Sequence, residues 1–114
     1  MSLLSEMKTI IESLGVPVET GKYSDPAPDR YVVLTPLTDM YELFTDNRPQ
    51  QTVEEVRAVL FDKGNYRQIK KQIEDAILAS DITITDRTYV SYDNDTGYHQ
   101  YAIDVAQNYY LLEE

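Results

Sequence analysis

Apolar residues near the start of the chain recur with the spacing of one side of an α-helix. They are Leu3, Leu4, Met7, Ile10, Ile11 and Leu14. Ser2 stands in front of this stripe and is a favourable N-cap residue. Gly15 follows the stripe and suits the left-handed conformation that ends many helices. The pattern predicts a first helix between Ser2 and Gly15, with its apolar side packed on the rest of the fold.

The segments that follow indicate strands. Residues 16–29 are punctuated by proline and glycine, which predicts mostly loop with room for a short strand. Arg30 to Thr35 is apolar on both faces in its middle, which predicts a strand inside a sheet. Pro36 predicts the end of that strand, because proline cannot donate a hydrogen bond to the ladder. Met40 to Asp46 alternates and predicts a second strand.

The polar run Asp46–Gln51 predicts the tip of a hairpin. The apolar residues of 52–62 fit either one side of a helix or one face of a strand. A strand is preferred, because β-branched and aromatic residues lead this segment and Asp62–Gly64 interrupts it.

A second helix is predicted from Asn65, as N-cap, to about Ser80. Its apolar residues at helical spacing are Tyr66, Ile69, Ile73, Ala76 and Ile77. The stretch from Ile82 to Tyr92 predicts a fourth strand, Asp93–Gly97 a turn, and Tyr98 to about Tyr110 a fifth strand.

The predicted order of elements is therefore α-β-β-β-α-β-β. Strands joined by short turns favour a mainly antiparallel sheet, with the two helices packed on it. The length of the chain is that of one domain, and no linker or internal repeat divides it. Residues 1–114 are expected to form a single α+β domain.

Charge and composition narrow the functional classes. The net charge is -10, from 20 acidic and 10 basic residues, so the surface repels phosphate backbones and anionic membranes. Sequence-specific nucleic-acid binding is not expected. The chain has no cysteine, which excludes disulfides and thiolate metal sites. Its start does not read as a signal peptide and no segment approaches a membrane span, so we expect a protein made in the cytoplasm.

Catalytic and metal-binding patterns are weak. Asp93 and Asp95 alternate as in a calcium loop, but Gly97 and Asp104 stand where that loop needs an oxygen ligand and a glutamate. A hairpin turn explains the stretch better. His99 is the only histidine and has no evident triad partners. We predict no catalytic residue, no metal site and no cofactor.

Two features favour an interaction surface. Ten tyrosines accompany no tryptophan, and many lie in the last hairpin, where they suit either cross-strand pairing or a protein–protein interface. Lys63, Arg67, Lys70 and Lys71 gather at the start of the second helix, against the preference of the helix dipole. A basic spot on an acidic body suits head-to-tail self-association, and a solvated helix face is the alternative.

Four stretches carry a family resemblance: ESLGVPVETG, SDPAPDRYVVLTPL, FDKGNYRQIKKQIEDAILAS and DTGYHQYAIDV. In this order they resemble small tail-completion proteins of tailed bacteriophages and prophages, the tail-terminator or head–tail joining components. The resemblance spans nearly the whole chain, in the order of its elements.

The resemblance implies a structural, non-enzymatic role in virion assembly. Such proteins have an α+β fold and form a ring, typically sixfold, that caps the tail tube and meets the head connector while DNA passes through. The partners would be copies of the chain, tail-tube proteins and head-connector proteins. The protein would reside in the host bacterial cytoplasm during assembly and afterwards in the virion. The acidic balance suits a wall that DNA must cross without binding.

In such a ring, the basic residues and the last hairpin would supply subunit contacts. The candidate interface residues are Lys63, Arg67, Lys70, Lys71, Tyr98 and Tyr101. The candidate flexible docking loop comprises Asp46, Asn47, Arg48 and Gln50. The first alternative is a small acidic binding or inhibitor protein of the DNA-mimic type, acting as a monomer. The second is a small enzyme that uses His99 or paired carboxylates.

Overall fold

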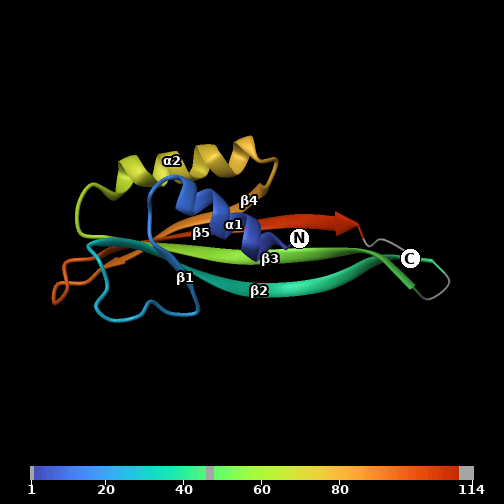
Figure 1. The fold of residues 1–114 in the computed structure, drawn as a ribbon, viewed down its shortest axis with the longest axis horizontal. Coiled ribbons are helices and arrows are strands. Elements are labelled where there is room, and N and C mark those ends of the chain that lie inside the picture. Colours follow the sequence, from blue (N-terminus) through green and yellow to red (C-terminus); the bar gives the residue numbers. More distant parts are fainter. Residues whose placement is uncertain (1, 46–47, 111–114) are drawn as a thin grey trace.

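The computed structural model describes residues 2–45 and 48–110. Two helices and five strands occur in the predicted order, which confirms the α+β class (Figure 1). They are α1 (Leu3–Ser13), β1 (Val18–Thr20), β2 (Arg30–Thr45), β3 (Arg48–Asp62), α2 (Tyr66–Ala79), β4 (Thr83–Tyr92) and β5 (His99–Tyr110).

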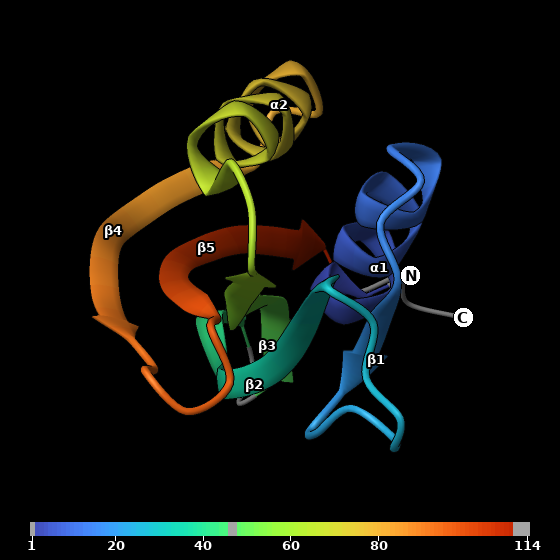
Figure 2. The ribbon, with the colours of Figure 1, turned by 90° about the vertical axis from the view of Figure 1, so that its left-hand side faces the viewer.

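The five strands form one sheet with the spatial order β1-β2-β3-β5-β4. Only β1 and β2 are parallel, and the other neighbours are antiparallel, as the sequence predicts. Both helices cover the same face of the sheet (Figures 1 and 2). Helix α1 lies over β1, β2 and β3, whereas α2 lies over β3 and β4. Neither of the helices that the structure describes lies on the opposite face of the sheet, which is called the open face below.

The core lies between the helices and the sheet. Leu3, Met7 and Ile11 project from α1 into it, and Ile69, Ile73 and Ile77 project from α2. The sheet contributes buried aliphatic side chains from its central strands, Val32, Leu34, Val56, Leu60, Ile103 and Val105. Burial of these two apolar helix faces is the main reason why the helices dock on this side.

Strand β2 differs from its prediction. Residues 30–45 form one strand, so the expectations that Pro36 ends a strand and that a separate strand begins at Met40 are both wrong. A β-bulge lies between Pro36 and Thr38, and β1 pairs with β2 only from Val32 to Leu34. Beyond Leu34, β2 is therefore an edge strand, where a proline at a bulge is tolerated. Strand β1 is the short strand for which the sequence left room within residues 16–29.

The hairpin of β2 and β3 extends well beyond the helices (Figure 1). The molecule measures 55 × 26 × 22 Å, and the hairpin runs along its long axis. We call residues 37–45 of β2 with residues 48–55 of β3 the arm. Arg48 and Gln50, which the sequence places in a loop, belong to β3. Asp46 and Asn47 lie outside the described residues, and the docking role of these four residues stays a prediction.

The ends of α1 follow the predicted chemistry. The Ser2 side chain accepts a hydrogen bond from the Ser5 backbone N–H, and the Ser5 hydroxyl completes a capping box. Glu54 of β3 also accepts a hydrogen bond from the Leu3 N–H at 2.8 Å. Gly15 has φ +78°, the left-handed conformation that glycine adopts without strain. Asn65 stands at the N-cap of α2, as predicted, but its side chain makes no capping hydrogen bond.

A tyrosine joins the end of β5 to α1. The Tyr109 hydroxyl donates a hydrogen bond to the Glu6 carboxylate. Burial raises the pKa of the Tyr109 phenol well above its usual value, and the hydrogen bond to Glu6 raises this pKa further. The folded protein thus holds the phenolic proton more tightly than the unfolded chain, whose tyrosines titrate near pH 10. This contribution is complete below pH 10 and is lost as the pH rises above it.

We therefore expect the free energy of unfolding to fall between about pH 9 and about pH 11, and to fall less steeply in Tyr109→Phe. Urea denaturation at the two pH values measures both slopes. Tyr31, whose pKa is also raised by burial, keeps part of the slope in every variant. Tyr110→Phe is the matched control, because Tyr110 is exposed. Equal slopes for wild type and Tyr109→Phe would contradict the assignment.

Candidate functional site

Helix α2 and strand β4 enclose an open cleft of about 670 Å³ on the helix-covered side. We call it the α2–β4 cleft. Its wall on α2 carries polar side chains spaced three or four residues apart, which places them on one side of the helix. The isoleucines of α2 occupy the buried side. The amphipathic pattern of α2 therefore fixes which side chains line the cleft.

Strand β4 contributes Ile84 and Arg87 to the cleft. They pair in register with Val105 and Ile103 of β5, which are both buried beneath the helices. Residues three apart on a regular strand would point to opposite faces. The β-bulge between Ile84 and Asp86 shifts the alternation by one residue, so that Arg87 also faces α2. Alternation in the sequence alone would have placed Arg87 on the other face.

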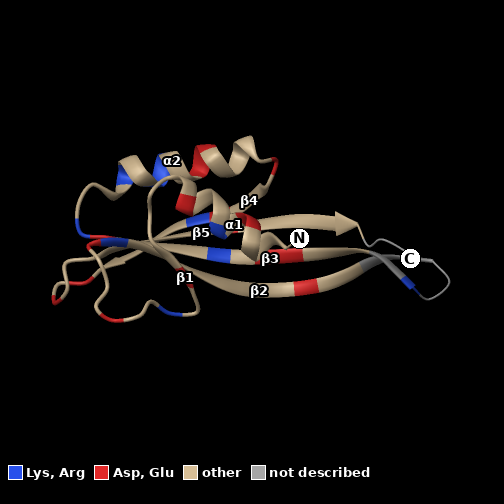
Figure 3. Cartoon of the chain, viewed as in Figure 1, with Lys and Arg blue, Asp and Glu red and all other residues tan. Residues whose placement is uncertain are grey.

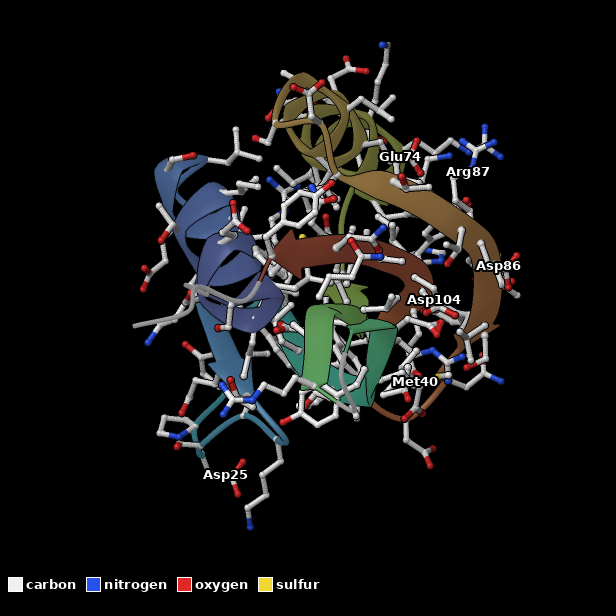
Figure 4. All side chains as sticks on the ribbon, turned by 90° about the vertical axis from the view of Figure 1, so that its right-hand side faces the viewer. Asp25, Met40, Glu74, Asp86, Arg87 and Asp104 are labelled. Carbon is white, nitrogen blue, oxygen red and sulfur yellow. The ribbon has the colours of Figure 1, made fainter. Side chains whose placement is uncertain are left out.

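A buried carboxylate lies at the base of the cleft. Figure 4 shows Glu74 of α2 beside Arg87 of β4. Arg87 Nη1 donates a hydrogen bond to Glu74 Oε1 at 3.1 Å. The Glu74 side chain is 10% exposed, whereas that of Arg87 is 54% exposed. The second carboxylate oxygen, Glu74 Oε2, is buried and has no hydrogen-bond partner among the described residues. The cleft thus contains an acceptor without a donor, which is rare in native proteins.

Of the other charges of the cleft, Arg67, Lys71 and Asp75 are exposed and Lys70 is half-buried. Lys71 Nζ lies 2.8 Å from Asp75 Oδ2, and this hydrogen bond raises the pKa of Lys71. Lys70 Nζ lies 4.8 Å above the ring of Tyr101. Arg67 is exposed and pairs with no carboxylate of the described part of the chain. The outer rim of the cleft therefore presents cations.

The structure brings three of the six predicted interface residues together. Arg67, Lys70 and Lys71 line the α2–β4 cleft. Lys63 lies apart from them, in the connection between β3 and α2. Its Nζ is 3.6 Å from Asp29 Oδ1 and 4.8 Å from the centre of the Tyr98 ring.

The two predicted interface tyrosines contact their own chain. The Tyr98 hydroxyl donates to the backbone oxygen of Pro28 at 2.5 Å, and its ring meets Tyr31 edge-on, with the centroids 5.4 Å apart. Tyr101 is 9% exposed and offers little surface to another molecule. Tyr89 and Tyr101 are also partners in the β4–β5 register. For these rings, pairing within one sheet describes what the structure shows.

His99 lies among aromatic rings. Its Nδ1 is 2.9 Å from the Tyr89 hydroxyl, and its ring centroid is 4.8 Å from that of Tyr92 and 5.0 Å from that of Tyr66. No carboxylate is among its described contacts. The Tyr89 hydroxyl and the neighbouring rings orient the imidazole, and no acid among the described contacts positions it as a general base.

The aspartate-rich turn between β4 and β5 is a hairpin turn, as predicted. Asp93 Oδ1 accepts from the backbone N–H groups of Asp95 at 2.9 Å and Thr96 at 3.4 Å. These hydrogen bonds lower the pKa of Asp93. Gly97 closes the turn with φ +83°. The Asp93 carboxylate is thus engaged by its own backbone, in the manner of an Asx turn.

Two structural findings and two comparisons with known proteins complete the description of the site. Across residues 2–45 and 48–110, no group of three or more His, Cys, Asp or Glu side chains is placed to hold a metal ion. None of the helices in that part of the chain is long and apolar enough to cross a membrane. No protein-family model matches the chain, and no curated protein sequence matches it.

Proposed function

We propose that the protein is a structural virion-assembly component of a tailed phage or prophage. It forms a ring at the head–tail junction or at the end of the tail, and DNA passes through the ring. The observation that carries this proposal is the separation of charge on one small domain. Cations gather at the α2–β4 cleft, whereas the arm carries Asp39, Glu54 and Glu55 along its length and Arg48 at the start of β3 (Figure 3).

Two different and complementary surfaces on one chain suit a head-to-tail contact. Such a contact closes into a ring when the rotation between neighbours divides a full turn. Complementary charges steer the encounter and fix the register of the contact. The net charge of -10 would keep the DNA from adhering as it passes. The α+β fold also agrees with what the resemblance to tail-completion proteins implies.

The first experiment is a charge reversal in the cleft. We expect wild type to associate as its concentration rises, and Lys70→Glu/Lys71→Glu to require at least about tenfold more protein for the same association. Static light scattering over a wide concentration range measures the mass of both. Lys8→Glu/Lys22→Glu is the matched control, because it changes the net charge equally at exposed residues of α1 and the β1–β2 loop. This control should associate like wild type.

The second candidate is the acidic binding or inhibitor protein, which the net charge of -10 favours. It requires a monomer at every concentration. Purified phage tail tubes and an immobilised basic protein then separate the two candidates. Retention of the chain on tail tubes supports the ring component. A monomer that is retained only by the basic protein would replace our proposal with the second candidate.

A further inference from the structure

The arm carries side chains that its own chain leaves uncovered. Met40 is 54% exposed and Tyr41 is 62% exposed, and Asp39 beside them is exposed too. In the antiparallel register, Asp39 is opposite Glu54 and Tyr41 is opposite Thr52. Glu54 bonds to the start of α1, so Asp39 and Tyr41 lie on the helix-side face of the arm. The outer edge of β2 has no strand partner here within the described residues.

The α2–β4 cleft has the complementary set of groups. Leu78, which is 57% exposed, and Ile84 offer apolar surface. Within the described part of the chain, Arg67 at the rim is a cation that pairs with no carboxylate. Glu74 Oε2 is a buried acceptor that lacks a donor among the same residues. A fitting occupant brings an anion, an apolar body and a hydrogen-bond donor together.

Asp39 and Tyr41 supply these three groups at a matching distance. Residues two apart on one face of a strand are separated by roughly 6.6 Å. Lys71 and Glu74, a cation and the buried carboxylate of the cleft, lie three residues apart on α2, and side chains at this spacing are separated by about 5–6 Å. Tyrosine combines a large apolar ring with a polar tip that seeks a partner when it is buried. Its hydroxyl is the donor that Glu74 lacks.

We infer that the α2–β4 cleft receives residues 39–41 of a second copy of this chain. Asp39 of one copy pairs with the cations at the rim. Tyr41 of the same copy packs on Leu78 and Ile84 and donates its hydroxyl to Glu74. The arm cannot fill its own cleft, because it extends away from α2 along the long axis (Figure 1). β-Bulges interrupt the outer hydrogen-bonding edge of β4. The arm therefore makes this contact through side chains and does not add a long strand to that edge.

This inference rests on the proposed ring, because it names the contact between neighbouring subunits. The experiment is therefore chosen so that a failure of the contact and a failure of the ring give different results. Tyr41→Asp disables the arm and Leu78→Asp disables the cleft, and both sites are exposed enough for the fold to tolerate the change. We expect each variant alone to stay monomeric at concentrations where wild type associates. Mixed in equal amounts, they should form a heterodimer of twice the monomer mass, because one intact arm meets one intact cleft. Sedimentation velocity measures these species, and circular dichroism confirms the fold.

Val90→Asp on the open face of β4 is the matched control, and it should associate like wild type. The chain has no cysteine, so Tyr41→Cys and Leu78→Cys copies give a second readout. Mixed and treated with an added thiol oxidant, they should cross-link to each other, whereas Tyr41→Cys mixed with Lys8→Cys should not.

The outcomes separate the contact from the ring. If the aspartate variants associate like wild type, or if the mixture stays monomeric beside an associating wild type, the contact is overturned and the ring proposal stands. A wild type that stays monomeric, with no cross-link between Tyr41→Cys and Leu78→Cys, also overturns the contact. The ring is then judged by retention of wild type on tail tubes, which does not depend on this contact.

Discussion

Ile77→Ala is expected to lower the free energy of unfolding by about 2–5 kcal/mol. Ile77 is fully buried where α2 packs on the sheet, and alanine leaves a cavity that rigid neighbours fill only in part. A domain of this size has a free energy of unfolding of roughly 5–15 kcal/mol, so the loss is a large share of the total. Urea denaturation measures it, and thermal unfolding should move down by about 10 °C or more.

Leu78→Ala, at the next residue of the same helix, is the control. Leu78 points away from the core and is 57% exposed, so its truncation should change stability by no more than about 0.5 kcal/mol. The two substitutions thus separate packing of α2 on the sheet from the surface that α2 offers to a partner. If Leu78→Ala lowered the free energy of unfolding as much as Ile77→Ala does, Leu78 would also pack in the core, and the orientation of α2 described above would be wrong.

The fold class followed from the sequence because its local signals agree with one another. The apolar stripes of α1 and α2 have the helical period, and the segments around them alternate or run apolar as strands do. The turn at Asp93–Gly97 has residues that bond their own backbone. Signals of this kind need no knowledge of the rest of the chain, so the order of elements could be predicted.

What could not be predicted depends on neighbours distant in sequence. Pro36 breaks a strand in the middle of a sheet but is tolerated in β2, because β1 covers only Val32 to Leu34. The sequence does not tell where β1 stops. For the same reason it did not reveal the arm, which exists because β2 continues past Pro36 and pairs with β3 along its length.

The candidate site was predicted only in its local part. Arg67, Lys70 and Lys71 are close in sequence and share one side of α2, so spacing was enough to group them. Arg87 joins them from β4 because of a β-bulge that the sequence pattern did not predict. Tyr101 was grouped with them by residue type, yet the packing of α2 and β4 buries it. Residue type indicates what a side chain can do, and the register decides whether it is accessible.

The second large effect concerns the ion pair at the base of the cleft. Arg87→Met should lower the free energy of unfolding by about 2 kcal/mol. It leaves Glu74 with no hydrogen-bond partner on either carboxylate oxygen, while that side chain is 10% exposed. A buried pair costs about 3–5 kcal/mol to break, and the expected value is smaller because Arg87 is half exposed. Urea denaturation of wild type and variant measures the loss.

Glu74→Leu should recover the stability that Arg87→Met loses. Replacing a buried ion pair by apolar groups of similar size is often neutral or stabilising, because the cost of desolvating the charges disappears. Here the gain should be larger than usual, since one oxygen of Glu74 has no donor even in the wild type. Lys71→Met is the control, because Lys71 and Asp75 are both mostly exposed and loss of their pair should change the free energy of unfolding far less than Arg87→Met does. An Arg87→Met/Glu74→Leu double variant no more stable than Arg87→Met alone would show that the loss comes from the packing of Arg87. If the double variant is as stable as wild type but no longer associates, Glu74 is kept in the cleft for binding at the expense of stability.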